Sequence, residues 1–238
     1  MEIPNVTAGF MFKLGFYRPQ FCQLALSYDK QTRLTHGLVL TKSVNNIPIV
    51  PQLLGGLQNM RMHCEQPLLL AFLSTEQVID SCIERLDTSD WKLNKLEATM
   101  GQHEYDDRPH GNPLEVDFLE TPRALNHIIR TAGADVSRLG SILVALEKML
   151  DWGKEIMESQ TGARDGENII TTEEVHHGFC IFDEKIIYLA DNCRALIFRG
   201  KYEEKRARAL IQVVSIALSK LQLEADNPRP TTTWPKRT

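Results

Sequence analysis

Residues 125–150, LNHIIRTAGADVSRLGSILVALEKML, decide the fold of this chain. Their apolar residues recur at steps of three and four, which places them on one stripe of a helix with a seven-residue repeat. The stripe consists of Leu125, Ile128, Ala132, Val136, Leu139, Leu143, Leu146 and Leu150. A helix with a single apolar stripe is marginally stable alone, so we expect this segment to pack against other helices.

Two later segments repeat the pattern. The second series contains Val175, Phe179, Phe182, Ile186, Leu189, Cys193 and Leu196, and the third contains Ala207, Leu210, Val214, Ala217 and Leu221. A capping box, Thr171 to Glu174, opens the second series, and Gly200 between the two series predicts a tight turn or a bend. The sequence therefore predicts three helices, of about 38, 28 and 23 residues, packed antiparallel over residues 123–227.

The N-terminal part has a different pattern. Residues 21–28 (FCQLALSY) and 34–41 (LTHGLVLT) flank a polar turn and predict a β-hairpin. Residues 68–86 predict a helix, and residues 91–100 predict a second, shorter helix that ends at Gly101. The expected fold class is α+β and predominantly helical: a small N-terminal β-containing region followed by a long antiparallel helical bundle.

Between the two parts, residues 103–122 combine prolines and glycine with acidic residues. A segment of this length and composition predicts an exposed acidic linker that marks a boundary. We therefore predict an N-terminal α/β region over residues 1–120 that includes this linker, the helical bundle over 123–227, and a disordered tail, rich in proline and threonine, over 228–238.

Composition excludes several classes of function. The 238 residues (27.1 kDa) include 27 basic and 31 acidic side chains, for a net charge of −4, which disfavours general nucleic-acid binding. The five cysteines are odd in number and contain no CxxC pair, as is typical of reduced thiols in a cytoplasmic protein. The sequence shows neither a signal peptide nor an apolar run of 18 residues, so we expect no membrane insertion.

Two groups of residues are candidate metal ligands. Asp106, Asp107, Glu115 and Asp117 lie in the acidic segment, and carboxylate oxygens suit Mg²⁺ or Ca²⁺. His176 and Cys180 are four residues apart on a predicted helix and could share a metal ion with a third ligand. The alternatives are a solvated acidic loop and ordinary helix positions, because no second ligand pair has zinc-finger spacing. Any cation binding would be weak.

Catalytic signatures are absent from the sequence. It contains no GxSxG, GxxxxGK[ST], GxGxxG or HExxH motif, and Leu54-Gly55-Gly56-Leu57 predicts a turn or a hinge. Cys64 beside His63 is the one adjacent Cys/His pair, and it would be the nucleophile of an enzyme with an unrecognised site. We expect no catalytic or cofactor-binding residues and no enzymatic activity.

Four stretches carry a family resemblance: residues 21–29 (FCQLALSYD), 66–73 (QPLLLAFL), 93–105 (LNKLEATMGQHEY) and 207–227. They resemble fungal proteins of the CorA-like, magnesium-transporter type. The resemblance implies a cytosolic α/β portion followed by long antiparallel helices. In that family the last helix continues into two membrane spans that carry a Gly-Met-Asn motif. This sequence lacks the motif and the spans, so no functional residue is transferred from the family.

These observations favour a non-enzymatic protein, similar to the cytosolic domain of CorA-like proteins, that acts through its long helices. It would form a homo-oligomer or bind a helical protein partner. A divalent-cation-responsive regulatory domain is the first alternative, based on the acidic segment and the resemblance. An enzyme with an unrecognised site is the second.

Overall fold

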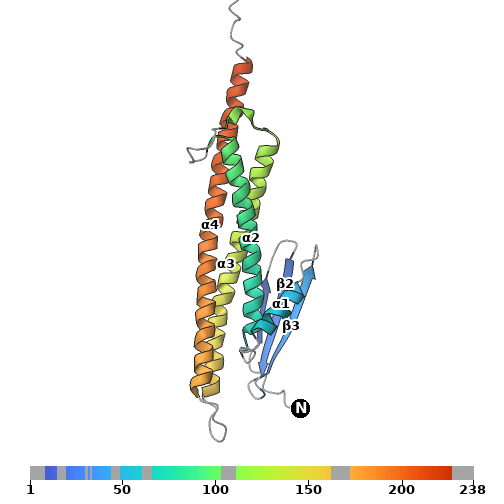
Figure 1. Cartoon of the computed structure of the whole chain (residues 1–238), viewed down its shortest axis with the longest axis vertical. Helices are drawn as coiled ribbons and strands as arrows, with labels where there is room; N and C mark the ends of the chain where they lie inside the picture. The colour runs from blue at the N-terminus through green and yellow to red at the C-terminus, as the bar shows by residue number, and fades with distance from the viewer. Residues whose placement is uncertain are drawn as a thin grey trace, which may run out of the picture. The chain divides into compact units, whose positions relative to one another are not determined.

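A computed structural model gives the fold (Figure 1). The structure describes residues 9–14, 20–29, 32, 34–43, 49–60, 66–102, 111–161 and 172–226. The elements are β1 (Gly9–Leu14), β2 (Gln20–Asp29), β3 (Leu34–Ser43), α1 (Ile49–Asn59), α2 (Leu69–Thr99), the short 3₁₀ helix η2 (Pro113–Glu115), α3 (Glu120–Thr161) and α4 (Thr172–Asp226). The predicted fold class, α+β and predominantly helical, is confirmed.

The chain forms two compact units, and each is built from two segments that are distant in sequence. The first, called the sheet unit below, comprises Met1–Arg85 and Ala134–Arg199. The second, called the helical unit, comprises Leu86–Gly133 and Gly200–Thr238. Helices α2, α3 and α4 each contribute residues to both units. The division therefore differs from the predicted one, in which a boundary near residue 120 separates an N-terminal from a C-terminal part.

The strands form an antiparallel sheet in the order β1-β2-β3. The predicted hairpin is β2 and β3, and β1 adds a third strand on the other side of β2. Leu24, Leu26 and Tyr28 of β2 are buried on one face. Helix α2 packs on the same face, since a side chain at Gly37 would lie 2.7 Å from Leu70. We call this the inner face.

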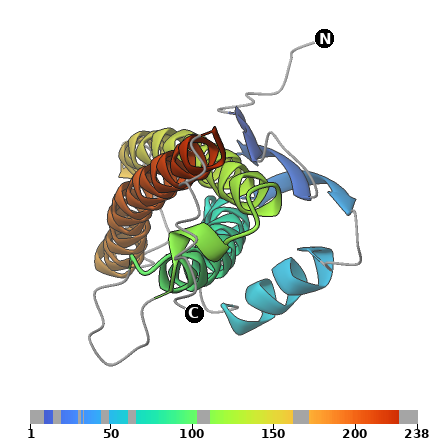
Figure 2. The ribbon, with the colours of Figure 1, turned by 90° about the horizontal axis from the view of Figure 1, so that it is seen from above.

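Helix α1 follows beside β3 (Figure 2). It contains the Leu54-Gly55-Gly56-Leu57 stretch, so the predicted turn or hinge there is wrong. A Cβ at Gly56 would come within 3.2 Å of the Leu73 side chain on α2. The close approach of α1 to α2 explains why a helix contains glycine at this position.

Helix α2 replaces the two helices predicted over 68–86 and 91–100. Its predicted end at Gly101 is confirmed. Gly101 has a φ of 66°, and its amide donates to the carbonyl of Ala98 (3.2 Å), while the amide of Gln102 donates to that of Glu97 (2.8 Å). These bonds form a Schellman motif, which satisfies the last carbonyls of the helix.

Helix α3 begins within the predicted acidic linker. The carboxylate of Asp117 accepts hydrogen bonds from the amides of Leu119 (2.8 Å) and Glu120 (2.9 Å), and its carbonyl accepts from that of Thr121 (2.9 Å). Asp117 is thus the N-cap of α3. The described part of the predicted linker is ordered structure, and residues 103–110 lie outside the described residues.

The buried stripe of α3 differs in phase from the predicted one. After Ala132 the buried positions are Asp135, Leu139, Ile142, Leu146 and Met149. Val136, Leu143 and Leu150, which were predicted in the stripe, are half-buried at its edge. The steps of three and four continue without a break only because the carboxylate of Asp135 occupies a core position.

Helix α4 is continuous, so the predicted turn at Gly200 is wrong. Gly200 and Glu203 are both buried, and they link the second predicted series to the third in one seven-residue phase: Leu196, Gly200, Glu203, Ala207. The three long helices are therefore α2, α3 and α4. Thr171 of the predicted capping box and the tail 228–238 lie outside the described residues.

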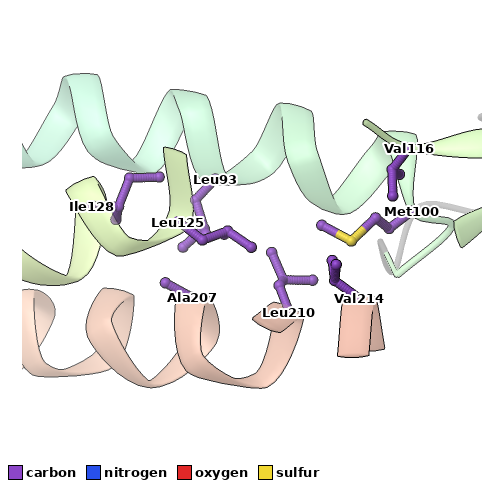
Figure 3. Close-up of a cluster of buried hydrophobic side chains, with 8 residues drawn as sticks. All are labelled: Leu93, Met100, Val116, Leu125, Ile128, Ala207, Leu210 and Val214. Atoms are coloured by element: carbon purple, nitrogen blue, oxygen red, sulfur yellow. The ribbon is translucent and has the colours of Figure 1, made fainter. Parts of the chain in front are cut away.

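All three long helices contribute to the core of the helical unit (Figure 3). The cluster contains Leu93 from α2, Met100 from its C-terminal turn, Val116 after η2, Leu125 and Ile128 from α3, and Ala207, Leu210 and Val214 from α4. In the sheet unit the same helices pack together with the sheet, and the rings of Phe72 and Phe182 lie 5.2 Å apart. Burial of these side chains contributes about 1.5–3 kcal/mol for each large one.

Candidate interaction surface

The described members of the acidic metal candidates have local structural roles. The Glu115 carboxylate accepts a hydrogen bond from the side-chain amide of Asn112 (3.1 Å). Asp117 caps α3, and the amides of Glu120 and Leu119 lower the pKa of its carboxyl. Both carboxylates are therefore engaged at the start of α3. Asp106 and Asp107 lie outside the described residues.

The second metal candidate is partly described. His176 lies in the first turns of α4, and its side chain is outside the described residues. Cys180 is described, and its thiol is exposed. Within the described ranges, no three His, Cys, Asp or Glu side chains are grouped so that they could hold a metal ion. Cation binding by the six candidate residues stays a prediction.

The described thiols differ sharply in accessibility. Cys82 on α2 and Cys193 on α4 are buried in the sheet unit. Burial raises the pKa of both thiols, and that of Cys193 rises to about 12. Neither forms a reactive thiolate near neutral pH. The alternative nucleophile Cys64 and its neighbour His63 lie outside the described residues.

A buried ionic cluster in the sheet unit joins α2 to α3. The Asp135 carboxylate accepts hydrogen bonds from Nε (3.0 Å) and Nη2 (2.8 Å) of Arg85 and from Nη1 of Arg138 (2.7 Å). Ser81 accepts a further bond from Arg85 (2.6 Å), and the Cys82 sulfur lies 3.2 Å from the same guanidinium. The pKa of Arg85 is raised by its bonds to Asp135, although desolvation opposes this. The Asp135 carboxylate thus bonds two guanidiniums, and these bonds tie α2 to α3.

A second ionic cluster joins α2 to α4 in the helical unit. Arg206 donates to Asp90 (2.6 Å), to Asn94, and to both carboxylate oxygens of Glu97 (2.9 and 2.6 Å). The bonds to Glu97 raise the pKa of Arg206. The Arg206 guanidinium also lies 5.6 Å from the centre of the Tyr202 ring. This arrangement holds an exposed aromatic ring in place.

A shallow hollow of about 630 Å³ lies in the sheet unit between β1 and α3. Its lining is Gly9, Met11, Lys148, Asp151, Trp152, Lys154 and Glu155. Lys148 and Asp151 form an ion pair with each other (3.3 Å). The lining therefore presents charges of both signs without a convergent set of polar groups, and it does not resemble an active site.

The outward face of α4 carries the clearest candidate interaction surface of the helical unit. Tyr202, Ala209, Ile216 and Leu223 follow each other at intervals of seven residues, and all four are exposed. The exposed fractions of Ile216 and Leu223 are 69% and 65%. The core residues of the same helix segment, Ala207, Leu210, Val214 and Ala217, lie on the other side of α4. We call the four exposed residues the α4 stripe.

Basic side chains lie beside the α4 stripe. Lys201, Lys205 and Lys220 are exposed at positions that flank or interrupt the stripe in its seven-residue repeat. Arg208 is also exposed, and it forms an ion pair with Glu204 (2.6 Å). At the C-terminal end of the stripe the exposed charges are acidic, namely Glu224 and Asp226. Charges that flank an apolar stripe help a helix to select its helical partner.

Comparison with models of known protein families, with curated proteins and with solved structures finds no match to this chain. Among the described helices, none combines the length and apolar character needed to cross a lipid bilayer.

Proposed function

We propose that this chain is a non-enzymatic interaction protein of the cytoplasm and that its long C-terminal helices bind another helix. The observation that carries the proposal is the α4 stripe: Tyr202, Ala209, Ile216 and Leu223, exposed in one seven-residue phase on α4. Apolar side chains that recur at this interval form one side of a helix–helix interface. Lys205, Gln212 and Ser219 are exposed between these apolar side chains. Exposed apolar side chains that share one phase of a helix can contact a second helix.

The charges beside the stripe favour a particular kind of helix. In a parallel pairing with a second copy, Lys201, Lys205 and Lys220 would face basic residues of that copy, and like charges across an interface are unfavourable. A helix with an apolar stripe and acidic flanks would complement them. In an antiparallel pairing, Lys201 and Lys205 would lie near the exposed Glu224 and Asp226 of the second copy. Self-association in that orientation is the alternative form of the proposal.

The resemblance to fungal CorA-like proteins belongs to the proposal too. An α/β part followed by long antiparallel helices is the architecture that this resemblance implies, and the structure has that general order. A chain with this relationship would use its helices for assembly.

Site-specific photo-crosslinking tests the proposal. A photoreactive residue at Ile216, within the stripe, is compared with one at Leu218, which is also exposed but lies on another side of α4. We expect crosslinked adducts from position 216 and few from 218, and mass spectrometry then identifies the partner segment as helical. Equal yields at both positions, or a monomer with no adduct at 216, would contradict the proposal.

A charge substitution provides the matching affinity test. Ile216→Glu and Leu218→Glu change the charge equally on the same helix, and Glu is a good helix former. Ile216→Glu should abolish binding of the partner that crosslinking has identified, and Leu218→Glu should leave that binding unchanged. Circular dichroism checks that both variants stay helical.

A further inference from the structure

The C-terminal end of α4 is exposed on nearly all sides in the part of the chain that the structure describes. Its last buried residue is Ala217, and residues 218–226 are all exposed except Leu221, which is half-buried. Figure 1 shows α4 continuing beyond the end of α2. A helix end without a packed face is marginally stable in water. This segment, which carries the last residue of the α4 stripe, Leu223, therefore gains stability from a partner that covers it.

The two ends of the α4 stripe carry opposite charges. Lys201 and Lys205 are exposed beside Tyr202, whereas Glu224 and Asp226 are exposed beside Leu223. A parallel pairing of two copies would place like ends together, and an antiparallel pairing places the basic end of each copy at the acidic end of the other. The acidic helix that the basic end requires is therefore present in the chain itself.

The stripe is also complementary to itself in one antiparallel register. If Tyr202 lies opposite Leu223 of the second copy, the equal spacing of the stripe places Ala209 opposite Ile216. Two-fold symmetry makes each of these contacts occur twice. The small side chain of Ala209 leaves room for that of Ile216, and the centre of the pair lies between residues 212 and 213.

The same register separates the like charges. In an antiparallel pair of identical helices, each side of the stripe meets the same side on the other copy. Lys201 and Asp226 lie on one side of the stripe, so Lys201 comes within one helical turn of Asp226 of the second copy. Lys205 lies on that side too and meets Ser219. Lys220 lies on the other side of the stripe, so it does not face Lys205.

From this complementarity we infer that the partner of the α4 stripe is α4 of a second copy, running antiparallel in a two-fold symmetric pair. The inference rests on the proposed function, because it names the partner of the same surface. Lys205, Gln212 and Ser219 interrupt the apolar contact, so the pair is weak. We expect a Kd of roughly 1–100 μM.

Analytical ultracentrifugation of the full chain, with a charge exchange, tests the inference. Lys201→Glu should raise the Kd of the dimer roughly tenfold, since two attractive contacts become repulsive. The double variant Lys201→Glu/Asp226→Lys should bring the Kd back to within about threefold of the wild-type value. In a parallel pair residues 201 and 226 are about 37 Å apart along the helix, so the exchange would restore nothing. Lys92→Glu, an exposed position on α2 of the same unit, is the control and should leave the Kd unchanged.

Disulfide crosslinking measures the orientation directly. Cys180→Ser removes the exposed native thiol and provides the background. In that background Gln212→Cys places two thiols together at the centre of an antiparallel pair. Leu223→Cys places them about 31 Å from each other's position along the helix. Under a mild oxidant Gln212→Cys should give a covalent dimer and Leu223→Cys should not, and peptide mass spectrometry identifies the bonded residues.

Three outcomes would overturn the inference. The first is a covalent dimer from Leu223→Cys but not from Gln212→Cys, which would show a parallel pair. The second is a dimer that Lys201→Glu weakens and Asp226→Lys does not rescue. The third is a monomer at all concentrations. In that case, adducts of position 216 with a helix of another protein would leave the proposed function intact, and the absence of any adduct would overturn both.

Discussion

Replacing Asp135 by alanine should destabilise the protein more than any surface substitution. The Asp135 side chain is 2% exposed and accepts three charge-assisted hydrogen bonds from Arg85 and Arg138. A hydrogen bond to a charged group contributes about 1.5–3 kcal/mol to stability, and removing the acceptor leaves the buried donor without a partner. The Arg138 side chain is nearly as buried, so its guanidinium cannot regain full hydration.

The expected loss is below the simple sum of these bonds. Arg85 is more exposed than Arg138 and keeps its bond to Ser81 in the variant, so part of its charge is solvated or paired. Removing one partner of a buried ion pair costs about 3–5 kcal/mol, and we expect Asp135→Ala to lie in that range. For a chain of this size the midpoint of thermal unfolding should fall by roughly 10 °C.

Urea unfolding followed by circular dichroism measures this loss. Glu147→Ala is the control, because the pair between Glu147 and Arg194 (3.6 Å) joins side chains that are more than half exposed. Such pairs contribute less than about 1 kcal/mol. If Asp135→Ala costs no more than Glu147→Ala, the buried cluster does not hold α2 against α3 as described here.

Three further outcomes are expected. Arg206→Met should lower the free energy of unfolding by about 2–4 kcal/mol in the same urea assay. Arg206→Lys should recover less than half of this loss, because a lysine cannot form the two parallel bonds to a carboxylate. An unchanged urea midpoint for Arg206→Met would contradict this expectation. Maleimide labelling read by peptide mass spectrometry should modify Cys180 in the native protein and Cys193 only after unfolding. The lowered pKa of Asp117 means that its capping bonds stabilise the fold above the pKa of the unfolded chain and are lost as the pH falls through the folded value. As the pH falls from 7, the free energy of unfolding should therefore decrease more in the wild type than in Asp117→Asn, because the cap of the variant does not titrate.

The sequence predicted the helical fold because most core positions are apolar, and it erred where they are not. On α3 the apolar steps of three and four lead through Val136, since a charged residue is not expected inside a core. The true stripe runs through Asp135, which is tolerable there because Arg85 and Arg138 neutralise it. Periodicity alone cannot detect this, because the neutralising partner lies on another helix.

The same limit explains the error on α4. Gly200 and Glu203 fill two successive core positions between Leu196 and Ala207, and they interrupt the apolar pattern without interrupting the helix. A glycine in a helix costs about 1 kcal/mol, which the packing of a 55-residue helix overrides. The preference of glycine for turns is therefore too small to predict a break in so long a helix.

The candidate interaction surface was only partly predictable. The sequence indicated helices that associate, and the α4 stripe could be found as residues seven apart. However, Tyr202, Ile216 and Leu223 compete with the equally apolar series that includes Leu210 and Val214, and only the tertiary packing shows which series faces solvent. The metal candidates rested on composition, and composition does not reveal that Asp117 is engaged as a helix cap.

The interleaving of the two units has a consequence for how the chain is made. The sheet unit needs Ala134–Arg199 as well as Met1–Arg85, so a nascent chain cannot close it until the first half of α4 has left the ribosome. The first 85 residues must wait, with their apolar strand faces accessible to chaperones. Folding is then governed by contacts between distant segments and should be slow for a mainly helical protein. No single cut in the sequence yields either unit whole.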